Sequence, residues 1–302
     1  MVQAQFEEKS FEAPLNHQLL AGSPYIYSPG QVLEASLGFD AALWTQNATL
    51  WGLFGKIPGP GVPITAPWLW PATGPSPRLP ALQSFNLNVF IQYKRPEALT
   101  RSYAREWTRW GQNYYRYFIT PHQQVALEDC MANLGGNGLV VYASPCFWQI
   151  DDLLRHTMAG TLVSETNFVD VSRLNGHARY TYVAAGNAGL ALSEPEEVPP
   201  ISMSKHMGKR IKTAPSLPEG ANILELAARA ITSAAKVSGL ASMEAIDEAI
   251  KLGFSHVPPA LEESRQSVLE PFAKVAAFCW LTGWLWLVGG PAQSTSPRSA
   301  DY

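Results

Sequence analysis

The chain is poor in cysteine and in charge, and both shortages narrow the classes of protein to which it can belong. Cys130, Cys146 and Cys279 stand far apart without C-x-x-C spacing, which argues against a disulfide scaffold and against a cysteine zinc site. Charged residues make up 16% of the chain and the formal net charge is −3, so a wholly basic nucleic-acid binder is disfavoured. Any contact with phosphate must therefore come from local basic clusters.

Three sequence signals are also missing. The acidic N-terminus has no apolar segment of the secretory kind, which together with the sparse cysteines predicts a location in a reducing cytoplasm. No G-x-S-x-G elbow surrounds Ser144, and no phosphate-binding G-x-x-x-x-G-K occurs. The sequence therefore lacks the motifs that a serine hydrolase of this type or a P-loop NTPase needs for its chemistry. With 302 residues, 46% of them hydrophobic, the chain can bury one substantial core.

One long uncharged run stands out between Val275 and Val288. A membrane-spanning helix needs roughly 20 apolar residues, and this run is shorter. We therefore expect a helix buried in the protein or in a dimer interface, in preference to association with a membrane.

The strand predicted at 85–94, FNLNVFIQYK, organises the rest of the chain. Side chains alternate along a strand, so one face is apolar and the other ends in Gln92 and Lys94, which point the same way. Upstream, Glu34 falls in a helix predicted at 30–38 and Asp40 opens a strand predicted at 39–45, which an apolar piece at 49–55 can join as a hairpin.

Downstream, the pattern predicts an amphipathic helix at 99–118, a helix at 121–134 and a buried strand at 138–143. Short strands are expected near 166–172 and 177–184, a proline-rich basic connector at 194–218, and helices beyond it. This alternation indicates an α/β class. The domain organisation we predict is an N-terminal extension at 1–27, a main α/β domain at 28–214, a helical C-terminal region at 215–290 and a disordered tail at 291–302.

Proline and glycine crowd the segment 57–80, which includes Trp68 and Trp70. Such a segment cannot supply ladder hydrogen bonds, so we expect a long loop. An insertion laid over the core is the favoured interpretation, and a lid or substrate-contacting loop is the alternative.

A local basic cluster follows the central strand. Residues 85–120 contain six lysines or arginines against two glutamates, and Arg101, Arg105 and Arg109 recur at helical spacing beside Arg95. One interpretation is a solvated face in which Glu97 pairs with Arg101. The other is contact with nucleic-acid phosphates by these four arginines.

Metal-dependent phosphodiester cleavage needs a hard cation, oxygen ligands and a positive group near the attacking water. Glu34 and Asp40 offer carboxylates, Gln92 offers an amide oxygen, and Lys94 offers the positive charge. Taken singly, each residue has an ordinary interpretation: Asp40 at a strand entry, Glu34 on an exposed helix, and Gln92 with Lys94 on the wet face of an edge strand.

The order of these elements, with G-F-D followed by I-Q-Y-K, resembles the PD-(D/E)XK or restriction-endonuclease-like superfamily, and within it the Q-x-K branch of modified-DNA restriction enzymes and prokaryotic antiviral nucleases. The resemblance covers roughly residues 28–145. It implies a mixed sheet flanked by helices. It also implies that Asp40 is the main ligand of Mg²⁺ or Mn²⁺, Gln92 the second ligand, Glu34 an auxiliary ligand and Lys94 the catalytic cation.

The resulting hypothesis is a Mg²⁺-dependent endonuclease that acts on DNA, with a role in antiviral defence implied by the resemblance alone. Its helical C-terminal region is expected to serve homo-oligomerisation or a partner protein. One alternative is a catalytically inactive module of the same fold that binds nucleic acid or a protein. A third is a structural subunit that docks through its tryptophan-rich helix. Tyr142, Ser144 and Gln149 follow the strand at 138–143 and are placed near the site by topology.

Overall fold

The computed structural model describes residues 1–21, 26–27, 85–186, 188–218, 221–254 and 263–290. The strands are β1 (Val2–Gln3), β2 (Ile26–Tyr27), β3 (Leu87–Tyr93), β4 (Glu97–Leu99), β5 (Tyr114–Phe118), β6 (Gly138–Pro145), β7 (Thr166–Asp170), β8 (Arg179–Tyr182), β9 (Gly189–Leu192), β10 (Glu196–Glu197) and β11 (Trp284–Gly289). The α-helices are α1 (Glu8–Ala21), α5 (Trp107–Trp110), α6 (Pro121–Leu134), α7 (Ile150–Ala159), α8 (Met203–Thr213), α9 (Ile223–Ser238), α10 (Met243–Phe254) and α11 (Glu263–Thr282), and Gly135–Asn137 and Val171–Arg173 form short 3-10 turns. The elements predicted at 30–38, 39–45 and 49–55, the insertion at 57–80 and the tail at 291–302 lie outside the described residues.

Strand β3 lies at the centre of a five-stranded sheet of order β2-β11-β3-β6-β7. It runs parallel to β6 and antiparallel to β11, and all seven of its residues are buried. A strand covered on both faces reads as a continuous apolar run. The interpretation of Gln92 and Lys94 as the wet face of an edge strand is therefore wrong.

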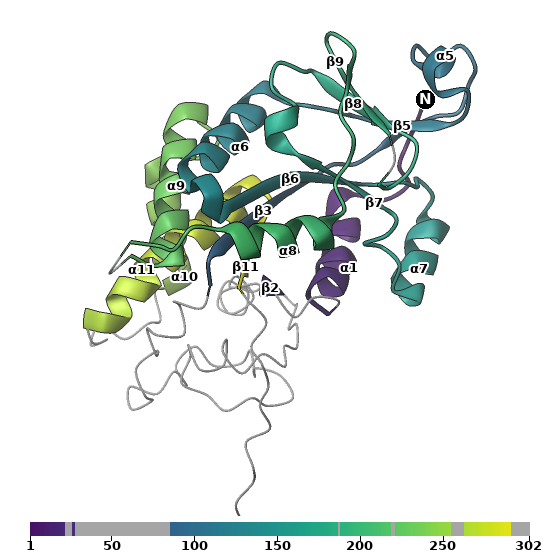
Figure 1. The fold of residues 1–302 in the computed structure, drawn as a ribbon. Helices are drawn as coiled ribbons and strands as arrows, with labels where there is room; N and C mark the ends of the chain where they lie inside the picture. The colour runs from purple at the N-terminus through teal and green to yellow at the C-terminus, as the bar shows by residue number, and fades with distance from the viewer. Residues whose placement is uncertain (22–25, 28–84, 187, 219–220, 255–262, 291–302) are drawn as a thin grey trace, which may run out of the picture.

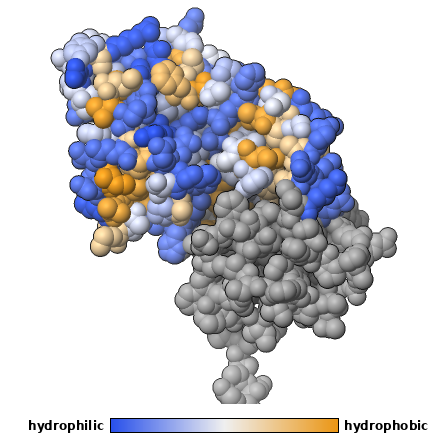
Figure 2. All heavy atoms as spheres, turned by 180° about the vertical axis from the view of Figure 1, so that it is seen from behind, coloured by the Kyte–Doolittle hydropathy of each residue, from blue (hydrophilic) through white to orange (hydrophobic). Residues whose placement is uncertain are grey.

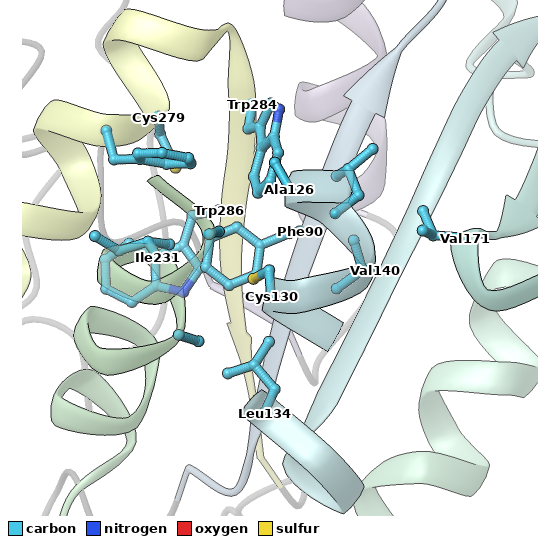
Figure 3. Close-up of a cluster of buried hydrophobic side chains, with 14 of the residues drawn as sticks. Phe90, Ala126, Cys130, Leu134, Val140, Val171, Ile231, Cys279, Trp284 and Trp286 are labelled. Carbon is cyan, nitrogen blue, oxygen red and sulfur yellow. The ribbon is translucent and has the colours of Figure 1, made fainter. Parts of the chain in front are cut away.

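Helices cover both faces of this sheet (Figure 1). Leu87, Val89 and Ile91 pack on one face in a cluster with residues of α1, α7 and α8. Phe90 points to the other face, where it meets residues of α6, α9 and α11 together with Trp284 and Trp286 of β11 (Figure 3). The predicted α/β class is confirmed.

The second sheet is antiparallel, with six strands in the order β1-β4-β5-β8-β9-β10. Its strands include Leu99 and Tyr114–Phe118, at the two ends of the segment for which a helix at 99–118 was predicted, so that prediction was wrong. Only the single turn of α5 forms there, and it ends at Gly111, whose φ of +64° is left-handed. The aromatic run Tyr114–Phe118 then pairs as a strand with β4 and β8, as bulky aromatic residues favour.

The C-terminal apolar run is not one helix. Gly283, with a φ of +73°, ends α11, and Trp284–Gly289 enters the sheet as β11 beside β3. The predicted helix over 275–288 is therefore wrong in its second half. Trp284 and Trp286 face one cluster while Leu287 faces the other, as strand alternation requires. Across the described residues, every helix is too short or too polar to span a bilayer.

Three further segments differ from, or extend, the predicted pattern. The N-terminal segment, predicted to be irregular, contains α1, whose Phe11 and Leu15 are buried under β3. The connector predicted at 194–218 contains α8, which buries Met203, Met207 and Ile211. The helices predicted beyond it are present as α9 and α10, and the cluster around Phe90 joins residues on both sides of position 215.

Seen from behind, the described surface is largely hydrophilic, with hydrophobic residues in small scattered groups (Figure 2).

Candidate active site

Polar side chains gather at the carboxyl ends of the two parallel strands β3 and β6. Gln92 lies opposite Tyr142 in the register, which ends at the next pair, Tyr93 with Ala143; Lys94 and Ser144 follow directly after this pair. The backbone holds this end together: Lys94 N donates to Ala143 O at 2.9 Å, and Ser144 Oγ donates to Lys94 O at 2.9 Å. The carboxyl ends of parallel strands are where α/β proteins place their ligands.

The Lys94 ammonium is buried without a carboxylate beside it. The residue is 9% exposed, its Nζ donates to Gln123 Oε1, and Nζ lies 5.4 Å from the centroid of the Tyr142 ring. Among the described residues, Lys94 forms no salt bridge, although the charge of Glu8 favours its protonated form. Burial lowers the pKa of Lys94 from 10.5 to about 8, because a low-dielectric site disfavours the charged amine.

The first turn of α6 fixes the ring beneath this amine. Tyr142 Oη donates to Gln124 Oε1 at 2.9 Å, and Gln124 Nε2 donates to Glu128 Oε1 at 2.6 Å and to Val171 O at 3.1 Å. Burial raises the pKa of Tyr142, so the phenol stays neutral and remains a donor. The helix forms here because Pro121 suits a first helical position and Gly135 ends the helix.

The second sheet closes over the same end of β6. Tyr182 Oη lies 2.7 Å from Ser144 Oγ and donates to Pro145 O at 2.7 Å. The ring of Tyr117 lies 5.7 Å from that of Tyr142, and its buried hydroxyl has no hydrogen-bond partner. The rings of Tyr142, Tyr117 and Tyr182 thus pack together at this end of β6.

Gln92 carries an unused acceptor. The residue is 4% exposed, and its Nε2 donates to Tyr93 O at 2.9 Å, while Oε1 is buried without a donor. Trp284, its neighbour in the register of β11, also keeps an unpaired Nε1. A buried acceptor left unpaired costs about 1–3 kcal/mol. A neutral amide oxygen of this kind is a suitable ligand for a hard cation.

The two carboxylates of the predicted metal site, Glu34 and Asp40, lie outside the described residues. Within the part of the chain that the structure describes, no group of three or more His, Cys, Asp or Glu side chains could hold a metal ion. The fit of Mg²⁺ or Mn²⁺ can thus be judged only at Gln92, whose unpaired Oε1 fits it.

The four predicted nucleic-acid-binding arginines do not form a helical stripe, because the helix that would align them is absent. Arg95 anchors the N-terminal segment: its Nε donates to Ala4 O at 3.2 Å, and its Nη1 pairs with Glu7 at 2.9 Å. Arg101 donates to the hydroxyl of exposed Tyr103. Glu97 pairs with Arg116 across β4 and β5 at 2.6 Å, so its predicted pairing with Arg101 is wrong. Only Arg105 and Arg109 are brought together, at one cavity beside α5.

The structure also adds residues to the site that sequence reasoning missed. Tyr142 and Ser144, placed there from topology, do adjoin Lys94, whereas Gln149 is an exposed residue at the start of α7. Gln123 and Gln124 were not foreseen. The one available signal was their position in the first turn of α6, the α-helix that directly precedes β6, the parallel neighbour of β3.

Comparison of the chain with protein-family models, with curated proteins and with solved structures finds no match.

Proposed function

We propose that the chain is a metal-dependent nuclease that hydrolyses phosphodiester bonds of DNA at the carboxyl end of β3. One observation carries the proposal: the Lys94 ammonium is buried and pairs with no carboxylate among the described residues, on the same strand face as Gln92, whose Oε1 accepts no hydrogen bond from them. A buried unpaired charge is costly, and such costs concentrate at functional sites.

Lys94 is the group that stabilises negative charge as the phosphodiester is attacked. Its pKa of about 8 keeps it protonated at neutral pH, and its burial strengthens its interaction with a phosphate oxygen. Tyr142 and Gln123 fix the position of the amine from two sides. Positioning of this kind lets the charge act without reorganisation during the reaction.

Glu34, Asp40 and Gln92 would hold the cation. A bound Mg²⁺ or Mn²⁺ supplies Lewis acidity toward the phosphate and lowers the pKa of a bound water. Gln92 contributes a neutral oxygen, so the charge of the ligand set rests on the two carboxylates. The acceptor that Gln92 Oε1 leaves unused supports this assignment.

The chain path supports a restriction-endonuclease-like core. Strand β3 contains Gln92 and ends one residue before Lys94. The chain then forms β4, α5 and β5, and only afterwards α6 and β6, which lies parallel to β3 and next to it. With the segment from β4 to β5 taken as an insertion, β3, α6 and β6 follow the strand, helix and strand order that the sequence resemblance implies. A role in cytoplasmic defence against foreign DNA belongs to the same proposal and rests on the resemblance alone.

The test is cleavage of supercoiled plasmid by the full chain with Mg²⁺, Mn²⁺ or EDTA. We expect nicked and linear products with either metal and none with EDTA. Asp40→Ala abolishes cleavage, while Asp247→Ala, at an exposed position of α10, leaves it unchanged. DNA binding without cleavage under any metal would overturn the proposal and favour an inactive binding module.

A further inference from the structure

A cavity of about 400 Å³ lies beside the second sheet, and none of its lining residues belongs to the candidate active site. Its walls come from α5 and the turn before it, from β8 and β9, and from the segment that leads from β9 into β10; α5, β8 and β9 are labelled in the upper part of Figure 1. Three arginines line it: Arg105, Arg109 and Arg179. The cavity is within the size range of pockets for small ligands.

The two glutamates of the walls are already paired. Glu106 is 6% exposed, and its oxygens accept from Arg179 Nη2 at 3.0 Å and from Tyr114 Oη at 2.8 Å. Glu197 accepts from Arg109. Arg105 is exposed and contacts no carboxylate among the described residues, so the walls carry one positive charge in excess.

Arg179 also has a donor, Nε, that forms no hydrogen bond with the described residues. Its Nη2 is held by Glu106, whereas its Nε is buried with no hydrogen-bond partner. An unpaired buried donor next to an uncompensated guanidinium is a favourable setting for an oxyanion. Guanidinium groups suit phosphate in particular, because their planar fork can donate two parallel hydrogen bonds.

The base of the cavity is apolar. Leu190 and Leu192 point to the same side of β9, being two residues apart, and are 7% and 5% exposed. Pro195 completes this part of the wall. A ligand that fills the cavity therefore combines an anionic group with a weakly polar part that can contact these apolar side chains.

We propose that this cavity binds one nucleotide unit, with its phosphate at Arg105 and its base against Leu190 and Leu192. The choice of a nucleotide among phosphate-bearing ligands rests on the proposed nuclease function. The unit comes either from a free nucleotide or from a strand that also reaches Lys94. The bound nucleotide is not cleaved in this cavity, because the residues of the candidate active site lie elsewhere.

Calorimetric titration of the full chain in EDTA tests binding without cleavage. The probes are thymidine monophosphate, thymidine, inorganic phosphate and single-stranded octathymidylate. Arg105→Gln removes the unpaired charge, and Thr108→Glu adds a negative charge at an exposed position of the wall. Neither side chain forms a hydrogen bond or ion pair with another described residue, so both variants should fold. Arg155→Gln, on the exposed face of α7, is the matched control.

We expect thymidine monophosphate to bind more tightly than thymidine or phosphate, and each cavity variant to weaken it about tenfold. Arg155→Gln and Lys94→Met leave its affinity unchanged. Competition by octathymidylate identifies a strand as the source, and its failure to compete identifies a free nucleotide. Absence of binding at millimolar nucleotide would overturn the cavity assignment, and so would an affinity equal to that of the parent in Arg105→Gln and in Thr108→Glu. Cleavage without nucleotide binding contradicts this inference alone, and binding without cleavage contradicts only the nuclease proposal.

Discussion

The Lys94 ammonium lies 5.4 Å from the centroid of the Tyr142 ring, on the shared face of two parallel strands, and pairs with no carboxylate among the described residues. A structural lysine in such a place would be expected to have a counter-ion. The ring and the amide of Gln123 compensate only part of the cost of burying the charge. Burial of the Lys94 charge therefore lowers the stability of the fold while it holds the ammonium in a fixed position.

Replacement of Lys94 by methionine should stabilise the protein. Lys94→Met keeps the length of the side chain and removes a buried charge, so we expect the free energy of unfolding at pH 7 to rise by about 1 kcal/mol. Urea unfolding measures it. Lys236→Met, at an exposed position of α9, should change stability by less than about 0.5 kcal/mol. A loss of stability in Lys94→Met would instead identify Lys94 as a structural residue.

The stability of the parent chain should depend on pH in the alkaline range. The pKa of Lys94 is about 8 in the folded protein and returns to its ordinary value of 10.5 on unfolding. Between these values the unfolded chain binds more protons, so the free energy of unfolding rises with pH across this window. Comparison of the parent with Lys94→Met isolates the effect, because the variant lacks this rise. Parallel pH profiles for the two proteins would refute the lowered pKa.

Loss of the ring under Lys94 should shift the pH dependence of cleavage. Because protonated Lys94 is required, the rate should fall as the pH rises through about 8. Tyr142→Leu removes the favourable cation–ring contact, so the pH at which the cleavage rate falls should decrease by about half a pH unit or more. Tyr142→Phe keeps the ring, so the pH at which the rate falls should not change. In this variant Gln124 Oε1 loses its donor, and the free energy of unfolding should fall by about 1 kcal/mol. An identical shift in both variants would argue against a role for the ring.

Gln92→Leu should weaken metal dependence without unfolding the chain. The substitution removes an oxygen ligand, so the Mg²⁺ concentration for half-maximal cleavage rises by about tenfold or more. It also removes a buried acceptor that lacks a donor, and the cost in stability stays below about 1 kcal/mol. Gln149→Leu, at an exposed position, serves as the control. An unchanged Mg²⁺ requirement would exclude Gln92 from the ligand set.

The parts of the fold that could be predicted have clear local signals in the sequence for where an element begins and ends. Pro121 and Gly135 delimit α6, and Asn222 caps α9 by accepting from Leu224 N and Glu225 N. The apolar run at 138–143 indicated β6 correctly because buried parallel strands read this way.

The failures occurred where one pattern fits two structures. Tyr114 and Tyr117 suit both a helical stripe and an aromatic strand, and the left-handed turn at Gly111 decides between them. The run at 275–288 is similarly ambiguous, and Gly283 divides it into a helix and a strand. Strand periodicity placed Gln92 and Lys94 on one face, but the contact with Gln123 depends on how α6 packs, which no local pattern encodes.

The proposed function requires the positive charge of Lys94 for metal-dependent cleavage. The decisive measurement is the single-turnover rate at which Lys94→Met cleaves plasmid in Mg²⁺. We expect the rate to fall by about 100-fold or more relative to the parent, with DNA binding retained and Lys236→Met unaffected. Cleavage by Lys94→Met at the rate of the parent would contradict the account.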